Sequence, residues 1–198
     1  YQCEIDENWC LIHATHANSG ELKKIIKSKA VVGLCPTTEA NLGDGIFPAN
    51  SLIQNDGFFG IGSDSQISIS PPEELKFLEY TQRLVNKKRM VLATKQFANN
   101  GVSLLNDAVI GGNKARGEIK SGIMPGARGD LIELNDKNNS CHSLTPDQVV
   151  NNWIFTNPNK MVQGVIVGGR QVVYDHAHPQ KQKFSKSYQK MVSETNIF

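Results

Sequence analysis

The sequence contains few cysteines and no long apolar run. Its four cysteines, in 198 residues, form no CxxC pair and follow no secretory signal. They therefore do not make a disulfide framework, and we expect reduced thiols. The apolar runs, such as residues 164–167, are far shorter than the ~20 residues needed to span a bilayer. We predict a cytoplasmic protein without membrane contact.

The sequence also lacks a large excess of either charge. Its 21 Lys and Arg residues oppose 19 Asp and Glu residues, which gives a net charge of +2. Nucleic-acid-binding proteins usually concentrate positive charge on a folded face, whereas the cationic residues here gather near the C-terminus (Lys181, Lys183, Lys186 and Lys190). We expect no nucleic-acid partner. The apolar fraction of 39% is enough for a packed core.

The first part of the chain alternates between apolar runs and helix signals. Runs at 9–12, 31–35 and 58–62 predict three buried strands. Asn18 with Glu21 has the pattern of a capping box before one helix, and the segment 70–73 (Ser-Pro-Pro-Glu) begins another. This order predicts a parallel α/β structure.

Three parallel strands cannot close a (β/α)8 barrel, in which the chemistry lies at the carboxyl ends of the strands. The chain begins at Tyr1 without a methionine. We therefore interpret it as the last part of such a barrel, belonging to a longer protein.

The second part of the chain changes character. A helix is expected with Ser103 as its cap and its end at Gly111-Gly112. Residues 131–134 predict a strand, and residues 162–173 predict a hairpin around Gly168-Gly169. We expect a catalytic domain at 1–122, a small β element at 123–175, and a polar tail at 176–198 that is mobile at its end.

Two side chains at strand ends are candidates for catalysis. His13 follows the first apolar run, where it could be a ligand, a general acid or base, an oxyanion donor, or a hydrogen-bonded residue that closes the strand. Asp64 follows the third run among glycines, where it could bind a metal, take a proton from a metal-bound water, or cap a turn. The acidic side chain disfavours a phosphate cradle at this turn.

The segment 35–45 follows the second apolar run and is expected to be a long loop that shapes a substrate pocket. Glu39 and Asn41 could position a polar ligand there, although a self-bonded loop needs neither role. Cys35 is expected to pack as a small apolar group rather than to react.

Four segments together resemble the formimidoylglutamate deiminases, a family within the metal-dependent amidohydrolase superfamily. The segments are 13–16 (HATH), 33–49 (GLCPTTEANLGDGIFPA), 60–65 (GIGSDS) and 125–131 (PGARGDL). The resemblance covers nearly the whole chain except the tail. Related purine and pyrimidine deaminases tend to have an asparagine-lysine version of the CPTTEANLGDG stretch.

The resemblance implies a distorted (β/α)8 barrel with one catalytic zinc, and a β-sandwich built from both chain ends. This chain would hold strands six to eight and the C-terminal share of the sandwich. The implied reaction is the hydrolysis of N-formimino-L-glutamate, a small molecule of histidine breakdown, to N-formyl-L-glutamate and ammonia. By position, His13 matches the histidine that contacts substrate and the attacking hydroxide, and Asp64 matches a zinc ligand and proton shuttle.

The family's other zinc ligands and its acid/base glutamate are missing from this chain. An HxH pair occurs only at 176–178, in the polar C-terminal segment, and no histidine precedes a glutamate by three positions. His16 and His142 match no ligand position either, and Gln66 stands where the family often has histidine. We expect the chain alone to be inactive and the full-length protein to be compatible with a homodimer. The alternatives are another zinc deaminase, such as a guanine-type enzyme, and a truncated half-barrel that acts only as an interaction module.

Overall fold

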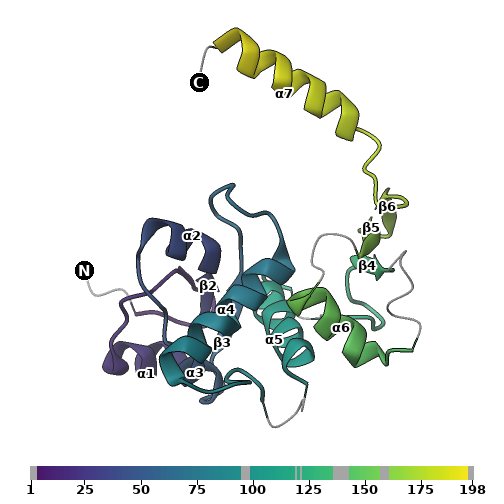
Figure 1. Cartoon of the computed structure of the whole chain (residues 1–198). Helices are drawn as coiled ribbons and strands as arrows, with labels where there is room; N and C mark the ends of the chain where they lie inside the picture. Colours follow the sequence, from purple (N-terminus) through teal and green to yellow (C-terminus); the bar gives the residue numbers. More distant parts are fainter. Residues whose placement is uncertain are drawn as a thin grey trace. The chain divides into compact units, whose positions relative to one another are not determined.

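The computed structural model describes residues 4–94, 99–118, 120, 122–135, 143–156 and 161–195. Cys3, Cys141 and His142 lie outside these ranges, so the expectations for them are not addressed. The chain forms two compact units (Figure 1), one of residues 1–127 with 143–158 and the other of residues 128–142 with 159–198. The first unit therefore extends past the expected boundary at 122 and also includes the later segment 143–158.

The first unit is built on a parallel sheet in the order β1-β2-β3. Its strands are β1 (Cys10–Ile12), β2 (Val31–Leu34) and β3 (Phe58–Ile61), so the predicted parallel α/β order is confirmed. The register sets Ile12 beside Gly33 and Gly33 beside Gly60. All three strands therefore end at the same edge of the sheet.

The strands differ in burial, contrary to the prediction of three buried strands. In β2, Val31, Val32 and Leu34 are fully buried. In β1, the side chain of Ile12 is 57% exposed. Both β1 and β3 are edge strands of the described sheet, but α5 packs mainly on β3 and β2. The apolar pattern alone could not show which strands a helix covers.

Two helices begin where the sequence predicts. The α1 helix (Ser19–Ser28) has the complete capping box between Asn18 and Glu21. The α4 helix (Pro71–Asn86) follows Ser70 with proline at its start, but the hydroxyl of Ser70 makes no capping hydrogen bond. The predicted start of α4 is thus confirmed, and Ser70 is its N-cap residue by position although its side chain makes no capping hydrogen bond.

The segment 35–45 is not the expected loop. It contains the α2 helix (Pro36–Leu42), and α3 (Ala49–Ile53) follows it. Pro36 occupies the first turn, and Gly43 ends α2 with a φ of 71°, a left-handed conformation that glycine adopts without strain. The polar composition of the segment predicted a loop, although Pro36 and Gly43 are signals for the start and the end of a helix.

The α5 helix (Asn100–Ala115) also differs from the prediction at both ends. Asn99 rather than Ser103 is its N-cap residue, and the helix continues through Gly111 and Gly112. Gly111 is needed inside the helix because a Cβ atom there would lie 1.8 Å from the carbonyl oxygen of Phe59 on β3. The absent side chain lets α5 pack directly on the sheet.

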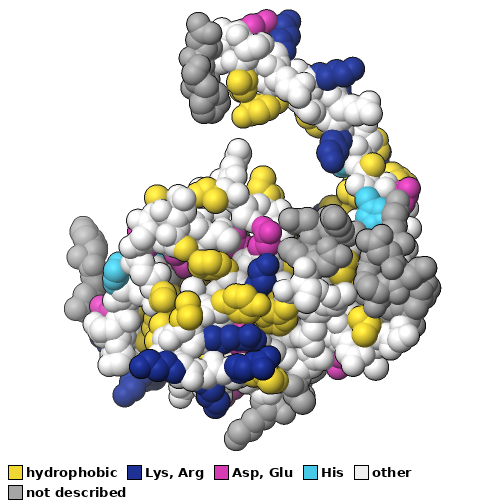
Figure 2. Space-filling model, in the orientation of Figure 1, with side chains coloured by type: hydrophobic (Ala, Val, Ile, Leu, Met, Phe, Trp, Pro, Cys, Tyr) yellow, Lys and Arg dark blue, Asp and Glu magenta, His cyan; other side chains and the backbone are white. Residues whose placement is uncertain are grey.

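The remaining helix of the first unit, α6 (Pro146–Phe155), packs against α4 and α5 (Figure 1). Arg83 of α4 lies 5.0 Å from the ring centre of Tyr80 and 5.5 Å from that of Phe155. Figure 2 shows exposed apolar and cationic side chains gathered on this face. On α4 the exposed apolar residues are Phe77, Tyr80, Leu84 and Val85.

The second unit contains an antiparallel sheet of β4 (Leu131–Leu134), β5 (Val162–Val167) and β6 (Arg170–Val173). Gly168 and Gly169 form the tight turn with φ values of 57° and 79°, so the predicted hairpin is confirmed. The expected polar tail contains the α7 helix (Lys181–Thr195), whose side chains include none that are buried. Among the described residues, no helix is long and apolar enough to cross a membrane.

Candidate active site

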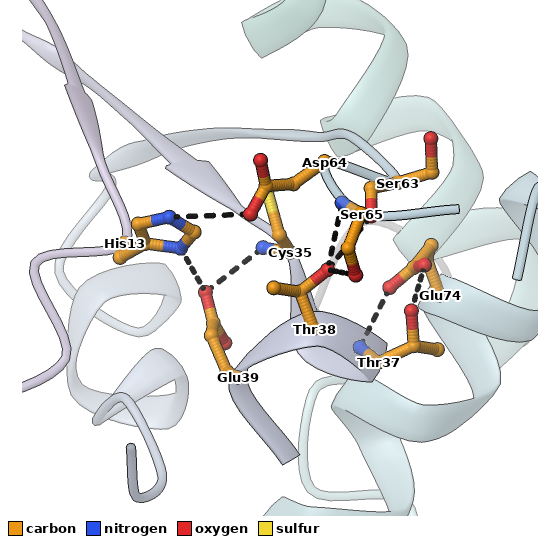
Figure 3. Close-up of polar contacts among 9 residues, drawn as sticks. All are labelled: His13, Cys35, Thr37, Thr38, Glu39, Ser63, Asp64, Ser65 and Glu74. Carbon is orange, nitrogen blue, oxygen red and sulfur yellow. Dashed lines mark hydrogen bonds and ion pairs between the residues drawn. The ribbon is translucent and has the colours of Figure 1, made fainter. Parts of the chain in front are cut away.

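His13 and Asp64 lie together at the carboxyl edge of the parallel sheet. His13 directly follows β1 and Asp64 lies three residues after β3. Nε2 of His13 is 3.7 Å from Oδ2 of Asp64 (Figure 3). Both residues have a left-handed backbone, with φ values of 63° and 52°. Such strain in residues other than glycine clusters at functional sites.

Cys35 follows β2 and completes this cluster. Its Sγ atom and the ligand atoms of His13 and Asp64 all lie within 4.8 Å of one another, and this is the one such group of three found in the described part of the chain. Burial, and then the nearby carboxylates of Glu39 and Asp64, raise the pKa of the Cys35 thiol to about 11. The thiol is therefore protonated at neutral pH, and it packs in the site as a neutral group.

Glu39 contacts this cluster from the first turn of α2. Its side chain is 6% exposed. Oε1 accepts a hydrogen bond from the backbone N–H of Cys35 at 2.9 Å and lies 3.2 Å from Nδ1 of His13. Asn41, the other expected pocket residue, is exposed farther along α2. The structure thus brings Glu39 to the site and leaves Asn41 at the surface.

Thr38 is a residue of the site that the sequence analysis missed. Its hydroxyl donates to the carbonyl oxygen of Ser63 at 2.8 Å, because a carbonyl can only accept. The same oxygen accepts from the backbone N–H of Ser65 at 3.2 Å and lies 2.8 Å from the Ser65 hydroxyl. Thr38 therefore holds both neighbours of Asp64 (Figure 3). Reading the segment as a helix would have placed Thr38 and Glu39 on its first turn.

The first turn of α2 is itself fixed to α4. Glu74 accepts hydrogen bonds from the backbone N–H of Thr37 at 2.9 Å and from the Thr37 hydroxyl. Burial raises the pKa of the Glu74 carboxyl, and the hydrogen bonds from Thr37 oppose that change. The helix that carries Thr38 and Glu39 is therefore anchored to α4 at its first turn.

The other candidate side chains are not in this cluster. His16 is exposed and lines, with His13, a cavity of about 700 Å³ beside α1. Gln66 is exposed two residues after Asp64. His176 and His178 belong to the second unit.

Comparisons with known proteins agree with this arrangement. A sequence profile of the amidohydrolase family matches residues 3–172. The formimidoylglutamate deiminase of Pseudomonas aeruginosa is 40% identical over 96% of this chain and 42% of its own length. An amidohydrolase from Brucella melitensis superposes with a TM-score of 0.90 at 39% identity, over 97% of this chain and 42% of that protein.

An adenosine deaminase from Xanthomonas campestris with bound zinc superposes with a TM-score of 0.75 at 17% identity, over 93% of this chain and 42% of that protein. This likeness concerns the fold alone. The chain spans less than half the length of all three proteins. Because the family profile covers most of its residues, the chain belongs to the amidohydrolase family.

Proposed function

We propose that the protein containing this chain hydrolyses N-formimino-L-glutamate to N-formyl-L-glutamate and ammonia. The observation that carries the proposal is the approach of His13 Nε2 to Asp64 Oδ2, 3.7 Å apart at the carboxyl edge of a parallel sheet. The 40% identity to a formimidoylglutamate deiminase supports this choice of substrate. One water adds to the formimino carbon, and the C–N bond to the terminal nitrogen breaks.

In this proposal β1, β2 and β3 are strands six to eight of a distorted (β/α)8 barrel, and β4 to β6 are the C-terminal share of a β-sandwich. The TM-score of 0.90 to the Brucella melitensis amidohydrolase supports a common architecture. The strand ends of a barrel form its catalytic rim, and His13, Cys35 and Asp64 all follow strand ends.

We assign to Asp64 the role of a zinc ligand. Its carboxylate is 48% exposed and faces His13, and carboxylate oxygens are among the ligands of zinc. Zinc sites need three or four protein ligands. Because we assign His13 to the reacting oxygen and Cys35 packs as a neutral thiol, the further ligands would come from residues outside this chain. We therefore propose that the chain alone is inactive. When bound, zinc lowers the pKa of a coordinated water to near neutrality.

The residues of this chain then perform two tasks. The carboxylate of Asp64 accepts both protons that the water loses, one as it adds and one as the C–N bond breaks, and passes each in turn to the formimino nitrogen, which leaves as ammonia. The ring of His13 presents Nε2 to the oxygen that water adds to the formimino carbon, and holds that oxygen in place by accepting a hydrogen bond from its O–H. Both tasks require the two side chains to keep their mutual orientation.

We also propose a cytoplasmic location and a homodimer for the whole protein. The free thiols of Cys10 and Cys35 are compatible with a reducing compartment. Exposed apolar side chains on α4, among them Tyr80 and Leu84, offer a surface for a second copy. Light scattering of the purified protein would measure the assembly directly.

The test is Asp64→Asn in the whole protein, with Asp56→Asn as its control. Asp56 is also exposed and also has a left-handed φ, 57°, but it precedes β3 instead of following it. Losing a general acid and base costs about 10²- to 10⁴-fold in rate, so we expect ammonia release to fall by at least ~100-fold and zinc content to fall with it. The control should keep both. Full activity and full zinc content in Asp64→Asn would remove Asp64 from its assigned role.

A further inference from the structure

We propose that Glu39 is a positioning residue that fixes the ring orientation and tautomer of His13. Its carboxylate holds Nδ1, so that Nε2 is turned toward Asp64. The structural part of this inference stands by itself, and its consequence for the rate rests on the proposed function.

The hydrogen bonds around one oxygen determine the tautomer. The backbone N–H of Cys35 can only donate, so Oε1 of Glu39 acts as an acceptor at 2.9 Å. The same oxygen lies 3.2 Å from Nδ1 of His13. Two acceptors would not bond each other, so Nδ1 must carry the hydrogen. In the neutral ring, Nε2 is then left without a proton and faces Oδ2 of Asp64 at 3.7 Å.

The burial of Glu39 makes this contact well suited to positioning. The side chain of His13 is 34% exposed and that of Glu39 is 6% exposed. The histidine follows an edge strand in a left-handed conformation, with φ at 63°. The glutamate sits on α2, which is anchored through Thr37 to α4. The more exposed partner is therefore held by the buried one.

Two other roles for Glu39 fit less well. A substrate contact needs an accessible oxygen, but the side chain of Glu39 is only 6% exposed and its Oε1 is already shared between a backbone donor and a ring nitrogen. A metal-ligand role is not supported, because Glu39 is absent from the group of His13, Cys35 and Asp64 whose ligand atoms converge. The contact resembles the carboxylate–histidine pairs that orient rings in metalloenzymes, where loss of the outer partner typically costs about 10- to 100-fold.

The experiment compares Glu39→Gln and Glu39→Ala with Glu79→Gln in the whole protein. Glu79 is buried as well and also accepts backbone N–H groups, those of Val91 and Leu92. These hydrogen bonds and its ion pair with Arg83 on α4 involve no residue of the site. The first readout is the tautomer of His13, measured by long-range ¹H–¹⁵N NMR on protein with labelled histidine and without substrate. Zinc content, kcat and KM are measured on the same samples.

We expect the Nδ1–H tautomer in the wild type. It should persist in Glu39→Gln, whose amide oxygen can accept both hydrogen bonds, and in Glu79→Gln. Glu39→Ala should lose the tautomer preference and about 10- to 100-fold in kcat, with KM and zinc content near wild type. Glu39→Gln should keep most of the wild-type kcat.

An Nε2–H tautomer in the wild type would overturn the inference, even if Glu39→Ala fails to fold. An unchanged tautomer in folded Glu39→Ala would also overturn it. Because the NMR readout uses no substrate, a wrong choice of reaction would leave the tautomer result intact, and the two failures can be distinguished.

Discussion

The Thr38 hydroxyl offers a sharp test of how the Asp64 turn is held. Replacing Thr38 by Val keeps the shape of the side chain and removes the hydroxyl. Three contacts are lost, with the carbonyl of Ser63 and with the N–H and hydroxyl of Ser65. Thr38 is 1% exposed, so water cannot replace its oxygen at the same place.

The magnitude follows from these contacts. A buried hydrogen bond contributes ~1 kcal/mol net, and a buried group left without a partner costs ~1–3 kcal/mol. Ser63 and Ser65 are only partly buried and regain some contact with water. We therefore expect a loss of roughly 2 kcal/mol in the free energy of unfolding. The left-handed backbone of Asp64 costs about 1–2 kcal/mol by itself, so its turn should relax and move the carboxylate.

The assay is zinc affinity, measured by competition with a chelator, together with denaturant unfolding of the whole protein. We expect Thr38→Val to weaken zinc binding by about 10- to 100-fold. Thr38→Ser keeps the hydroxyl and should stay close to wild type in zinc affinity. Wild-type zinc affinity in Thr38→Val would refute the reasoning that this hydroxyl holds the Asp64 turn.

Two further predictions concern the packing of α5 and the thiol at the site. Gly111→Ala should lower the unfolding free energy by about 3 kcal/mol or more, because its Cβ would collide with the carbonyl oxygen of Phe59. At Gly112, an added Cβ would have no atom within 4 Å, so Gly112→Ala should stabilise α5 by ~1 kcal/mol. Equal denaturation midpoints for the two variants would contradict the direct packing of Gly111 on β3. Cys35 should react with iodoacetamide at pH 8 far more slowly than the unfolded chain does, since the pKa of its thiol is raised to about 11. The unfolded thiol ionises above about pH 9, whereas the folded one keeps its proton to about pH 11. The contribution of this thiol to the free energy of unfolding should therefore fall as the pH rises through that window. Fast alkylation of the folded protein would contradict the burial of Cys35.

Local signals allowed several elements of both units to be predicted from the sequence. The capping box of Asn18 and Glu21 is complete within four residues, and the glycine pair at 168–169 suffices for its hairpin turn. The positions of β2 and β3 follow from short apolar runs. In each case the residues that stabilise the element are close to one another in the sequence.

The features that were missed depend on distant partners. Gly111 continues a helix because Phe59 of β3 lies against it, although two successive glycines usually end one. The first turn of α2 is stabilised through Thr37, Thr38 and Glu39, whose partners lie on α4 and at two other strand ends. The proximity of His13 and Asp64 follows from parallel strands, whereas the residues that orient them can be found only in the folded chain.

The most direct test of the central claim is steady-state ammonia release by the zinc-loaded whole protein, with N-formimino-L-glutamate and with guanine as substrates. We predict that kcat/KM for N-formimino-L-glutamate exceeds that for guanine by at least ~100-fold, because only a site built for the linear substrate pairs its polar groups. Ammonia release from guanine with none from N-formimino-L-glutamate would contradict the proposed function.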